Sequence, residues 1–138
     1  MFQILSKKFI KEFNLKIPEN SWLYTSTKDK LKYVKENTKY EVINDKYIIA
    51  YKSVKRNYSS VYKQGFLYEI GKTYTSHCDC NLSNENSFGL SAWTKKDALK
   101  YHNKGKLLKV KIMIKDIGAI VHNNGKIRCK KLQVIEVS

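Results

Sequence analysis

The chain has 138 residues, of which 42% are hydrophobic and 12% aromatic, and it carries a formal net charge of +15 at pH 7. This length suits one domain with one core, and the aromatic content excludes a disordered chain. No run of about 20 apolar residues is present, so we expect neither a membrane span nor a signal peptide. The three cysteines make a poor disulfide framework and are typical of an intracellular, cytoplasmic protein.

The N-terminal part of the chain, residues 1–38, is predicted to be helical. Phe9 and Phe13 are spaced as on one face of a helix within 6–14, and a second helix is predicted over 27–36. We expect the first helix to pack through its aromatic edge, and the second to turn Leu31 and Val34 inward and Lys28, Lys32 and Lys35 outward.

One six-residue pattern, Lys-Asp-x-Leu-Lys-Tyr, occurs twice, at 28–33 and at 96–101. In both copies a hydroxyl residue stands three positions before the aspartate. This spacing is close to a capping box, in which the two side chains satisfy free backbone N–H groups at the start of a helix. The repeat predicts a strand-to-helix unit used twice, with the later helix near 95–104. The capping pairs are Ser26 with Asp29 and Thr94 with Asp97.

Outside that helix, residues 39–138 are predicted to be mainly β. The segment 108–115 alternates strictly, with apolar side chains on one face and three lysines and a methionine on the other. The sequence therefore predicts an α+β fold, a single domain over 1–138 with a mostly antiparallel sheet and two or three short helices. The other expected strands are 40–43 with 47–54, 66–70 with 73–75, 119–122 with 126–129 around Asn124-Gly125, and 132–137.

Little in the sequence indicates metal or catalytic chemistry. His77, Cys78 and Cys80 suggest zinc, but structural zinc ligands usually lie two to four residues apart within each pair, and the remaining ligands here would be scattered. Neither a Ser-His-Asp order nor a Walker loop occurs. We expect no catalytic residue, no metal and no cofactor. Cys129 is interpreted as a core thiol, and His102 as a residue that favours a helix dipole or contacts phosphate.

Basic and aromatic residues gather in the last third of the chain. Lys96, Lys100 and Lys104 recur every fourth residue, as on one helical face. Lysines supply charges for phosphates and exposed tyrosines stack on bases, which together predict a surface for single-stranded nucleic acid or RNA. Trp93 is interpreted as a core residue because it ends an apolar strand. The predicted nucleic-acid-binding residues are Lys95, Lys96, Lys100, Tyr101, Lys104, Lys106, Lys109, Lys111, Lys126, Arg128, Lys130 and Lys131.

Residues 47–137 resemble an uncharacterised domain of phage and giant-virus proteins. The pattern of that family comprises a lysine-bearing strand, a Tyr-x-x-Gly-Lys hairpin, a Gly-Leu-x-x strand entering an Ala-x-x-Tyr helix, and a closing Lys-x-Arg strand with a later valine. The resemblance implies a viral or mobile-element origin and no activity. The matching residues are Tyr51 and Lys52, Tyr68 with Gly71 and Lys72, Gly89 and Leu90, Ala98 with Tyr101, and Lys126, Arg128 and Val134.

A more distant likeness is to ADP-ribosyltransferases, in which a glycine-led strand passes through a Ser/Thr turn into a helix that carries Ala and Tyr near the nicotinamide pocket. Gly89, Ala98 and Tyr101 follow this pattern. The likeness implies a pocket between the strand 47–54 and the unit 89–101, with Tyr51 and Tyr101 facing a planar ligand. That strand lacks the His or Arg that grips NAD in the family, and Glu136 is the only late acid, so we do not expect catalysis.

The strong positive charge favours a polyanionic partner. Our leading hypothesis is a small, basic, non-enzymatic accessory protein of viral or mobile-element type that binds nucleic acid or a nucleoprotein complex through the face from Lys95 to Lys131. Inhibition of host defence would suit such a protein. The alternatives are a structural or protein-interaction module that docks an acidic protein, with the loop 76–87 as its specific element, and a divergent ADP-ribosyltransferase-like NAD-binding protein. The plainest alternative is a lysine-rich solvated surface.

Overall fold

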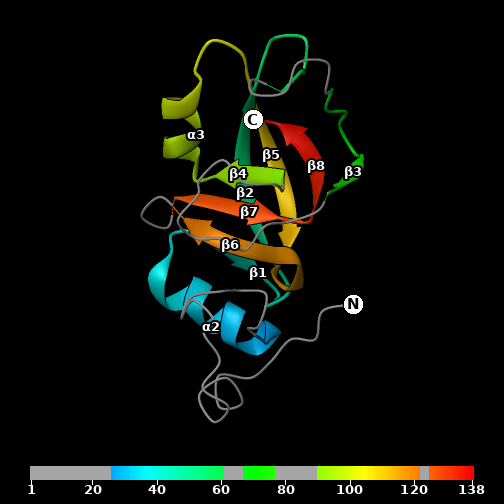
Figure 1. Cartoon of the computed structure of the whole chain (residues 1–138). Helices are drawn as coiled ribbons and strands as arrows, with labels where there is room; N and C mark the ends of the chain where they lie inside the picture. The colour runs from blue at the N-terminus through cyan, green and yellow to red at the C-terminus, as the bar shows by residue number, and fades with distance from the viewer. Residues whose placement is uncertain (1–25, 61–66, 77–89, 122–124) are drawn as a thin grey trace.

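The computed structural model describes residues 26–60, 67–76, 90–121 and 125–138, and it contains one eight-stranded sheet (Figure 1). The strand order is β3-β8-β5-β2-β4-β7-β6, with β1 paired to β2, and all pairings between the described strands are antiparallel. The strands are β1 (Glu41–Ile43), β2 (Tyr47–Val54), β3 (Thr73–Thr75), β4 (Leu90–Trp93), β5 (Lys106–Met113), β6 (Ile117–Val121), β7 (Lys126–Cys129) and β8 (Lys131–Val137). The described helices are α2 (Thr27–Asn37), α3 (Lys95–Tyr101) and the short 3-10 turn η2 (Ile114–Asp116).

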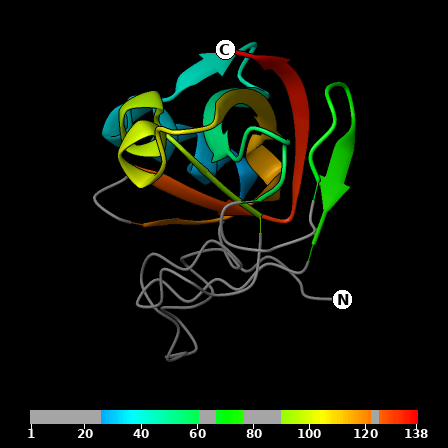
Figure 2. The same cartoon turned by 90° about the horizontal axis from the view of Figure 1, so that it is seen from above.

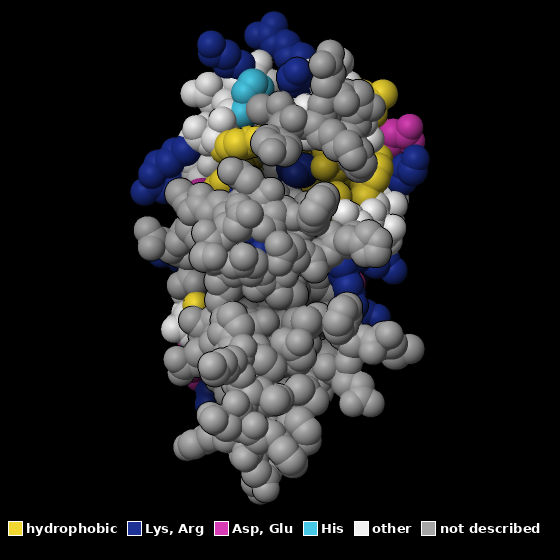
Figure 3. All heavy atoms as spheres, viewed as in Figure 1, with side chains coloured by type: hydrophobic (Ala, Val, Ile, Leu, Met, Phe, Trp, Pro, Cys, Tyr) yellow, Lys and Arg dark blue, Asp and Glu magenta, His cyan; other side chains and the backbone are white. Residues whose placement is uncertain are grey.

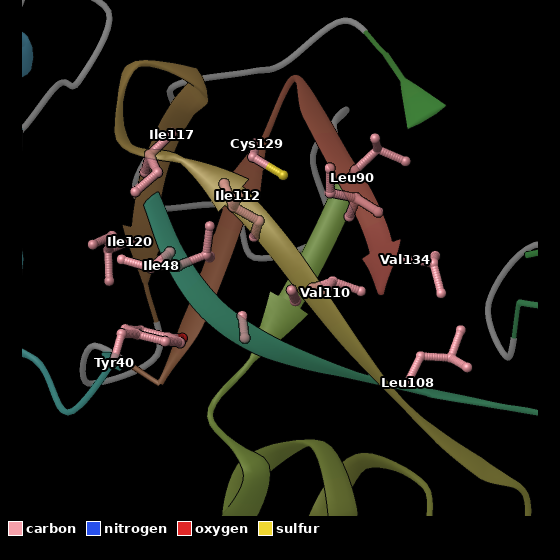
Figure 4. Close-up of a cluster of buried hydrophobic side chains, with 14 of the residues drawn as sticks. Tyr40, Ile48, Leu90, Leu108, Val110, Ile112, Ile117, Ile120, Cys129 and Val134 are labelled. Atoms are coloured by element: carbon pink, nitrogen blue, oxygen red, sulfur yellow. The ribbon is translucent and has the colours of Figure 1, made fainter. Parts of the chain in front are cut away.

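The sheet bends over on itself, so that distant strands contribute to one hydrophobic core. Ile48, Val110 and Val134 come from β2, β5 and β8, whereas Ile117 and Cys129 come from β6 and β7, yet all five belong to one buried cluster. Figure 4 shows these side chains converging from the two halves of the sheet. Burying each aliphatic side chain of this kind stabilises the fold by about 1.5–3 kcal/mol. We call the face of the sheet that points away from this core the outer face.

The helix α2 closes one end of this core. Its N-cap residue Ser26 accepts a hydrogen bond from the N–H of Asp29 at 3.2 Å, and Val34 on its inner side is fully buried. Lys30 is buried as well, and its Nζ donates to the backbone carbonyl of Ile117 at 2.8 Å. The lysine therefore ties α2 to the start of β6, because a buried ammonium needs acceptors around it.

The helix α3 packs against β2 and β4, on the side of the molecule away from β3 (Figure 1 and Figure 2). Its N-cap residue Thr94 accepts a hydrogen bond from the N–H of Asp97 at 3.3 Å. The buried Ser53 hydroxyl of β2 donates to the carbonyl oxygen of Ala98 at 2.6 Å, and the N–H of the C-cap residue His102 donates to the same carbonyl at 3.1 Å. The bond from Ser53 fixes α3 against the sheet, whereas the bond from His102 closes the end of the helix.

Removing the N-cap hydroxyl of α3 should weaken the helix. Thr94→Ala deprives the Asp97 N–H of its acceptor, and we expect it to lower the free energy of unfolding by about 1 kcal/mol, the usual cost of a lost N-cap. Ser26→Ala is the matched change at α2 and should cost a similar amount. Urea unfolding followed by circular dichroism measures both losses. Unchanged stability in both variants would contradict the capping roles.

The structure confirms the α+β class and the mostly antiparallel sheet. The helix predicted over 27–36 is α2, and the hairpin predicted from 40–43 and 47–54 is β1 with β2. The apolar side of 108–115 is fully buried, and so is Cys129. In both predicted capping pairs the hydroxyl accepts the N–H of its aspartate, which confirms the N-cap half of the predicted arrangement.

One predicted hairpin is wrong. In the described part of 66–70, Leu67 forms a bridge with Ser59, and β3 pairs with β8 instead of with this segment. The Gly71 N–H donates to the carbonyl of Val134 at 2.7 Å, so the turn itself is bound to β8. Ser59 and β8 are therefore the backbone partners of these two segments, in place of the expected pairing between them.

The helix predicted near 95–104 ends earlier, at Tyr101. The next residues approach β2 so closely that Gly105 lies against the carbonyl group of Val54. This approach leaves no room for another helical turn, because the backbone must straighten to begin β5. Lys104 therefore does not continue the helical face of Lys96 and Lys100, contrary to the sequence-based expectation.

Two other boundaries differ from the prediction. The strand expected over 108–115 begins at Lys106 and ends at Met113, where η2 turns the chain into β6. The hairpin of β6 with β7 is confirmed, but Val121 pairs with Lys126, so four residues instead of two connect the strands.

Some expectations fall outside the described residues. These are the helix 6–14, the strand expected before α2 in the first copy of the repeat, Gly89, and the loop 76–87 beyond Ser76, which includes His77, Cys78 and Cys80. Within the described part of the chain, no group of three or more His, Cys, Asp or Glu side chains could hold a metal ion. The helices of that same part are all too short or too polar to cross a membrane.

Candidate functional site

A row of polar and aromatic side chains crosses the outer face of the sheet. Residues paired across neighbouring strands lie on the same face. Glu136 pairs with Lys109, Lys109 with Tyr51, Tyr51 with Trp93, and Trp93 with Lys126. The row therefore runs from β8 through β5, β2 and β4 to β7. We call these five residues the outer-face row.

Trp93 is the most heavily contacted aromatic residue of this row. Its ring stacks on that of Tyr101, with 5.2 Å between the centroids and 21° between the planes, and the Nζ of Lys126 lies 4.8 Å from the Trp93 ring. Trp93 is buried, as predicted, whereas 43% of Tyr101 is exposed. An aromatic pair and a cation–π contact are each worth about 0.5–1.5 kcal/mol, so together they hold both rings in one arrangement.

The helix α3 adds positive charge beside the outer-face row. The Nζ of Lys95 lies 5.9 Å from the Tyr51 ring, which connects the first turn of α3 to β2. Lys95, Lys96 and Lys100 are all exposed. The helix thus presents three ammonium groups to solvent next to the Trp93–Tyr101 stack.

Further basic residues gather where β2 ends and β5 begins. Val54 pairs with Lys106, and the Nε of Arg56 donates to the carbonyl oxygen of Lys104 at 3.2 Å. Figure 3 shows Lys and Arg side chains at the upper end of the molecule, where α3 and these strand ends lie in Figure 1. We call this set the upper basic surface: Lys55, Arg56, Lys95, Lys96, Lys100, Lys104 and Lys106.

The upper basic surface concentrates positive charge. The segments 55–56 and 95–106 contain seven Lys and Arg residues, and Asp97 is their single acid. Lys106 is half-buried, with its Nζ 4.9 Å from the Tyr58 ring, whereas the other six basic residues are exposed. Charges of one sign gathered in this way attract polyanions and raise encounter rates.

The predicted residues of β5 lie on the outer face and engage neighbours there. The Nζ of Lys109 is 3.5 Å from the carboxylate of Glu136, and the Nζ of Lys111 is 4.2 Å from the Tyr47 ring. Both lysines are half-buried. Their charges are therefore already directed towards a carboxylate and an aromatic ring of the same sheet.

The predicted residues at the end of the chain occupy two other places. Lys126 and Arg128 are buried on β7, with Arg128 showing no exposed surface. Lys130 and Lys131 are exposed at the turn into β8, where Lys131 pairs with Thr75 of β3. Because β3 and α3 are on different sides of the molecule (Figure 2), this turn does not join the upper basic surface.

Sequence reasoning missed Lys55 and Arg56. They follow an apolar strand and form no motif with the lysines of α3, which lie about 40 residues later. Only the pairing of β2 with β5 brings them beside Lys104. The one sequence feature that could have identified them is that two adjacent basic residues follow the predicted strand 47–54.

Lys52 is a partly buried lysine on the core side of β2. Its Nζ donates to the carbonyl oxygen of Ser91 at 2.6 Å and lies 5.3 Å from the Tyr68 ring. Burial lowers the pKa of Lys52 from 10.5 to about 8; Cys129 opposes this change and the charge of Lys126 reinforces it. Keeping the ammonium charged therefore costs free energy in the folded state.

The pocket implied by the ADP-ribosyltransferase likeness would lie where β2 pairs with β4. The two tyrosines expected to face a planar ligand, Tyr51 and Tyr101, both lie beside Trp93 in the structure. Glu136, the late acid, belongs to the same outer-face row and forms an ion pair with Lys109. Comparison of the chain with protein-family models, curated proteins and solved structures yields no match.

Proposed function

We propose that this protein is a small nucleic-acid-binding accessory protein of viral or mobile-element type, which contacts phosphates through the upper basic surface. The observation that supports this most is the convergence of two distant segments, since Arg56 is hydrogen-bonded to Lys104 beside the lysines of α3. The viral or mobile-element origin rests on the resemblance of residues 47–137 to a phage and giant-virus domain.

The composition of the upper basic surface favours backbone contacts over base readout. Six of its seven basic residues are lysines, which act as point charges towards phosphates. Reading bases in a duplex major groove relies mainly on bidentate arginine contacts, and this surface holds one arginine. Binding of this kind is tolerant of sequence and strongly dependent on salt.

Charge reversal at this surface should abolish most of the binding. We expect Lys96→Glu, Lys100→Glu and Lys104→Glu together to weaken binding of a mixed-sequence, fluorescently labelled single-stranded oligonucleotide at least about 100-fold at roughly 50 mM salt. Because each phosphate contact contributes about −0.7 to the log–log salt slope for a single strand, losing three contacts should flatten that slope by about 2. Fluorescence anisotropy titrations at several salt concentrations measure both quantities.

A matched variant controls for net charge. Lys115→Glu, Lys130→Glu and Lys131→Glu reverse three other exposed lysines, which lie in η2 and at the turn into β8, and the overall charge changes equally. We expect only a few-fold loss of affinity in this variant. Equal losses in the two variants, with folding verified by circular dichroism, would mean diffuse attraction without a site. No binding by the unmodified protein would reject the proposal and favour an acidic protein partner.

A further inference from the structure

Arg56 is the one arginine of the upper basic surface, and its side chain is held near the far end. Its Nε donates to the backbone carbonyl oxygen of Lys104 at 3.2 Å, while the residue as a whole is exposed. Across residues 26–60, 67–76, 90–121 and 125–138, the guanidinium forms no other hydrogen bond and no ion pair. Its two terminal nitrogens, Nη1 and Nη2, are therefore left for a ligand from solution.

The turn that carries Arg56 is fixed as well. Tyr58 has a φ of +67°, in the left-handed region that a large side chain rarely adopts. The Lys55 N–H donates to the carbonyl of Ser59 at 2.9 Å, and the Tyr58 N–H donates to the carbonyl of Lys55 at 2.8 Å. The Oδ1 of Asn57 accepts the N–H of Ser59 at 3.1 Å. A strained residue persists only where its neighbours enforce it, so the backbone around Arg56 is held in one conformation.

The carbonyl group that accepts the Arg56 bond is equally constrained. Gly105 lies so close to the carbonyl group of Val54 that a side chain has no room there. The Lys104 carbonyl, one residue earlier, is thereby held beside the end of β2. Arg56 thus connects two fixed stretches of backbone, and its guanidinium is oriented before any ligand arrives. A group that is fixed in advance loses little conformational entropy on binding.

Resting on the proposed function, we infer that Arg56 anchors one backbone phosphate, with Nη1 and Nη2 each donating to one of its two non-bridging oxygens. The planar guanidinium matches such a pair of oxygens, whereas a lysine ammonium acts as a point charge. Lys55 and Lys104 are exposed, and each adds attraction without a preferred direction. The ligand is therefore a phosphodiester strand that is anchored at one phosphate and attracted electrostatically along the rest.

An anchor of this kind makes affinity depend on the shape of the side chain at position 56 as well as on its charge. Arg56→Lys keeps the positive charge but loses the paired donors and the bond to the Lys104 carbonyl. We expect it to weaken binding of the labelled single-stranded oligonucleotide about 10-fold, the equivalent of one charge-assisted hydrogen bond. The log–log salt slope should stay nearly unchanged, because the number of positive charges is the same. Fluorescence anisotropy titrations at several salt concentrations measure both quantities.

The matched control moves the guanidinium by one residue. Lys55→Arg combined with Arg56→Lys has the same composition and charge as the unmodified protein. Because the Lys104 carbonyl orients the side chain at position 56, we expect this double variant to bind as weakly as Arg56→Lys alone. Recovery of the unmodified affinity would overturn the inference, since any guanidinium in the turn would then serve. Circular dichroism verifies that both variants fold.

Nuclear magnetic resonance tests the contact without any substitution. Arg56 and Arg128 are the two arginines of the chain, so isotope labelling of arginine alone gives few side-chain signals. A two-point contact stops rotation of the guanidinium, and we expect the Nη signals of Arg56 to separate into distinct resonances when the oligonucleotide is added. Saturated binding with no change in these signals would contradict the anchor.

The outcomes separate this inference from the proposed function. If Arg56→Lys binds like the unmodified protein while the triple charge reversal at Lys96, Lys100 and Lys104 still abolishes binding, the anchor is rejected and phosphate binding by the surface stands. A flattened salt slope in Arg56→Lys would indicate lost charge contacts and would also overturn the anchor. Absence of any oligonucleotide binding rejects both proposals.

Discussion

Gly105→Ala is expected to lower the free energy of unfolding by about 3 kcal/mol or more, at the upper end of the cost of overpacking. A Cβ at position 105 would overlap the carbonyl oxygen of Val54 and would lie 2.9 Å from the Val54 carbonyl carbon and 3.0 Å from the Cα of Lys55. These atoms belong to the backbone, so they cannot move aside as the end of a flexible side chain can. Urea unfolding of the full chain measures the loss.

Gly71→Ala is the matched control. Gly71 has a φ of +86°, which strains any other residue, but no atom lies within 4 Å of a Cβ built there. We expect a cost of about 1 kcal/mol from this strain alone. Similar losses in the two variants would contradict the close approach at Gly105. Because that approach keeps Lys104 beside Arg56, Gly105→Ala should also weaken oligonucleotide binding, whereas Gly71→Ala should not.

The free energy of unfolding should rise by about 2 kcal/mol between pH 7 and pH 9.5 through Lys52 alone. The folded-state pKa of Lys52, about 8, lies below its ordinary value of 10.5, so between these values the unfolded chain binds more protons than the folded protein. Stability therefore increases with pH across this window. Below pH 8 the lysine is charged in both states, and the full cost of its burial is present.

Lys52→Met isolates this contribution, since it keeps an unbranched side chain and cannot titrate. We expect its stability to lack the rise of the unmodified protein, and Lys115→Met, at an exposed lysine, should retain that rise. Burial raises the pKa values of Tyr40 and Tyr68, so these tyrosines lower the free energy of unfolding only as the pH rises beyond about 10. The titration therefore ends at pH 9.5. Parallel curves for Lys52→Met and the unmodified protein would show that Lys52 does not carry the effect.

The candidate site could be predicted only in part. The lysines of α3 and the aromatic residue that ends it follow from the capping pair and the helical spacing, which are local features of 94–101. The location of Lys104 was predicted incorrectly, because helical spacing in the sequence carries no information about how closely Gly105 approaches the end of β2. Burial of Lys126 and Arg128 also escaped prediction, since lysine and arginine are ordinarily exposed and only their place on β7 decides otherwise.

The sequence by itself determined those features that depend only on residues close together in the chain. The caps at Ser26 and Thr94 start the two described α-helices, and the alternation of 108–115 identifies the inner face of β5. Tertiary structure alone decided which elements meet. The pairing of β3 with β8 and the outer-face row depend on backbone hydrogen bonds between segments far apart in the chain. Any strand offers the same backbone donors and acceptors, so the choice of partner follows from how the bent sheet buries one shared core.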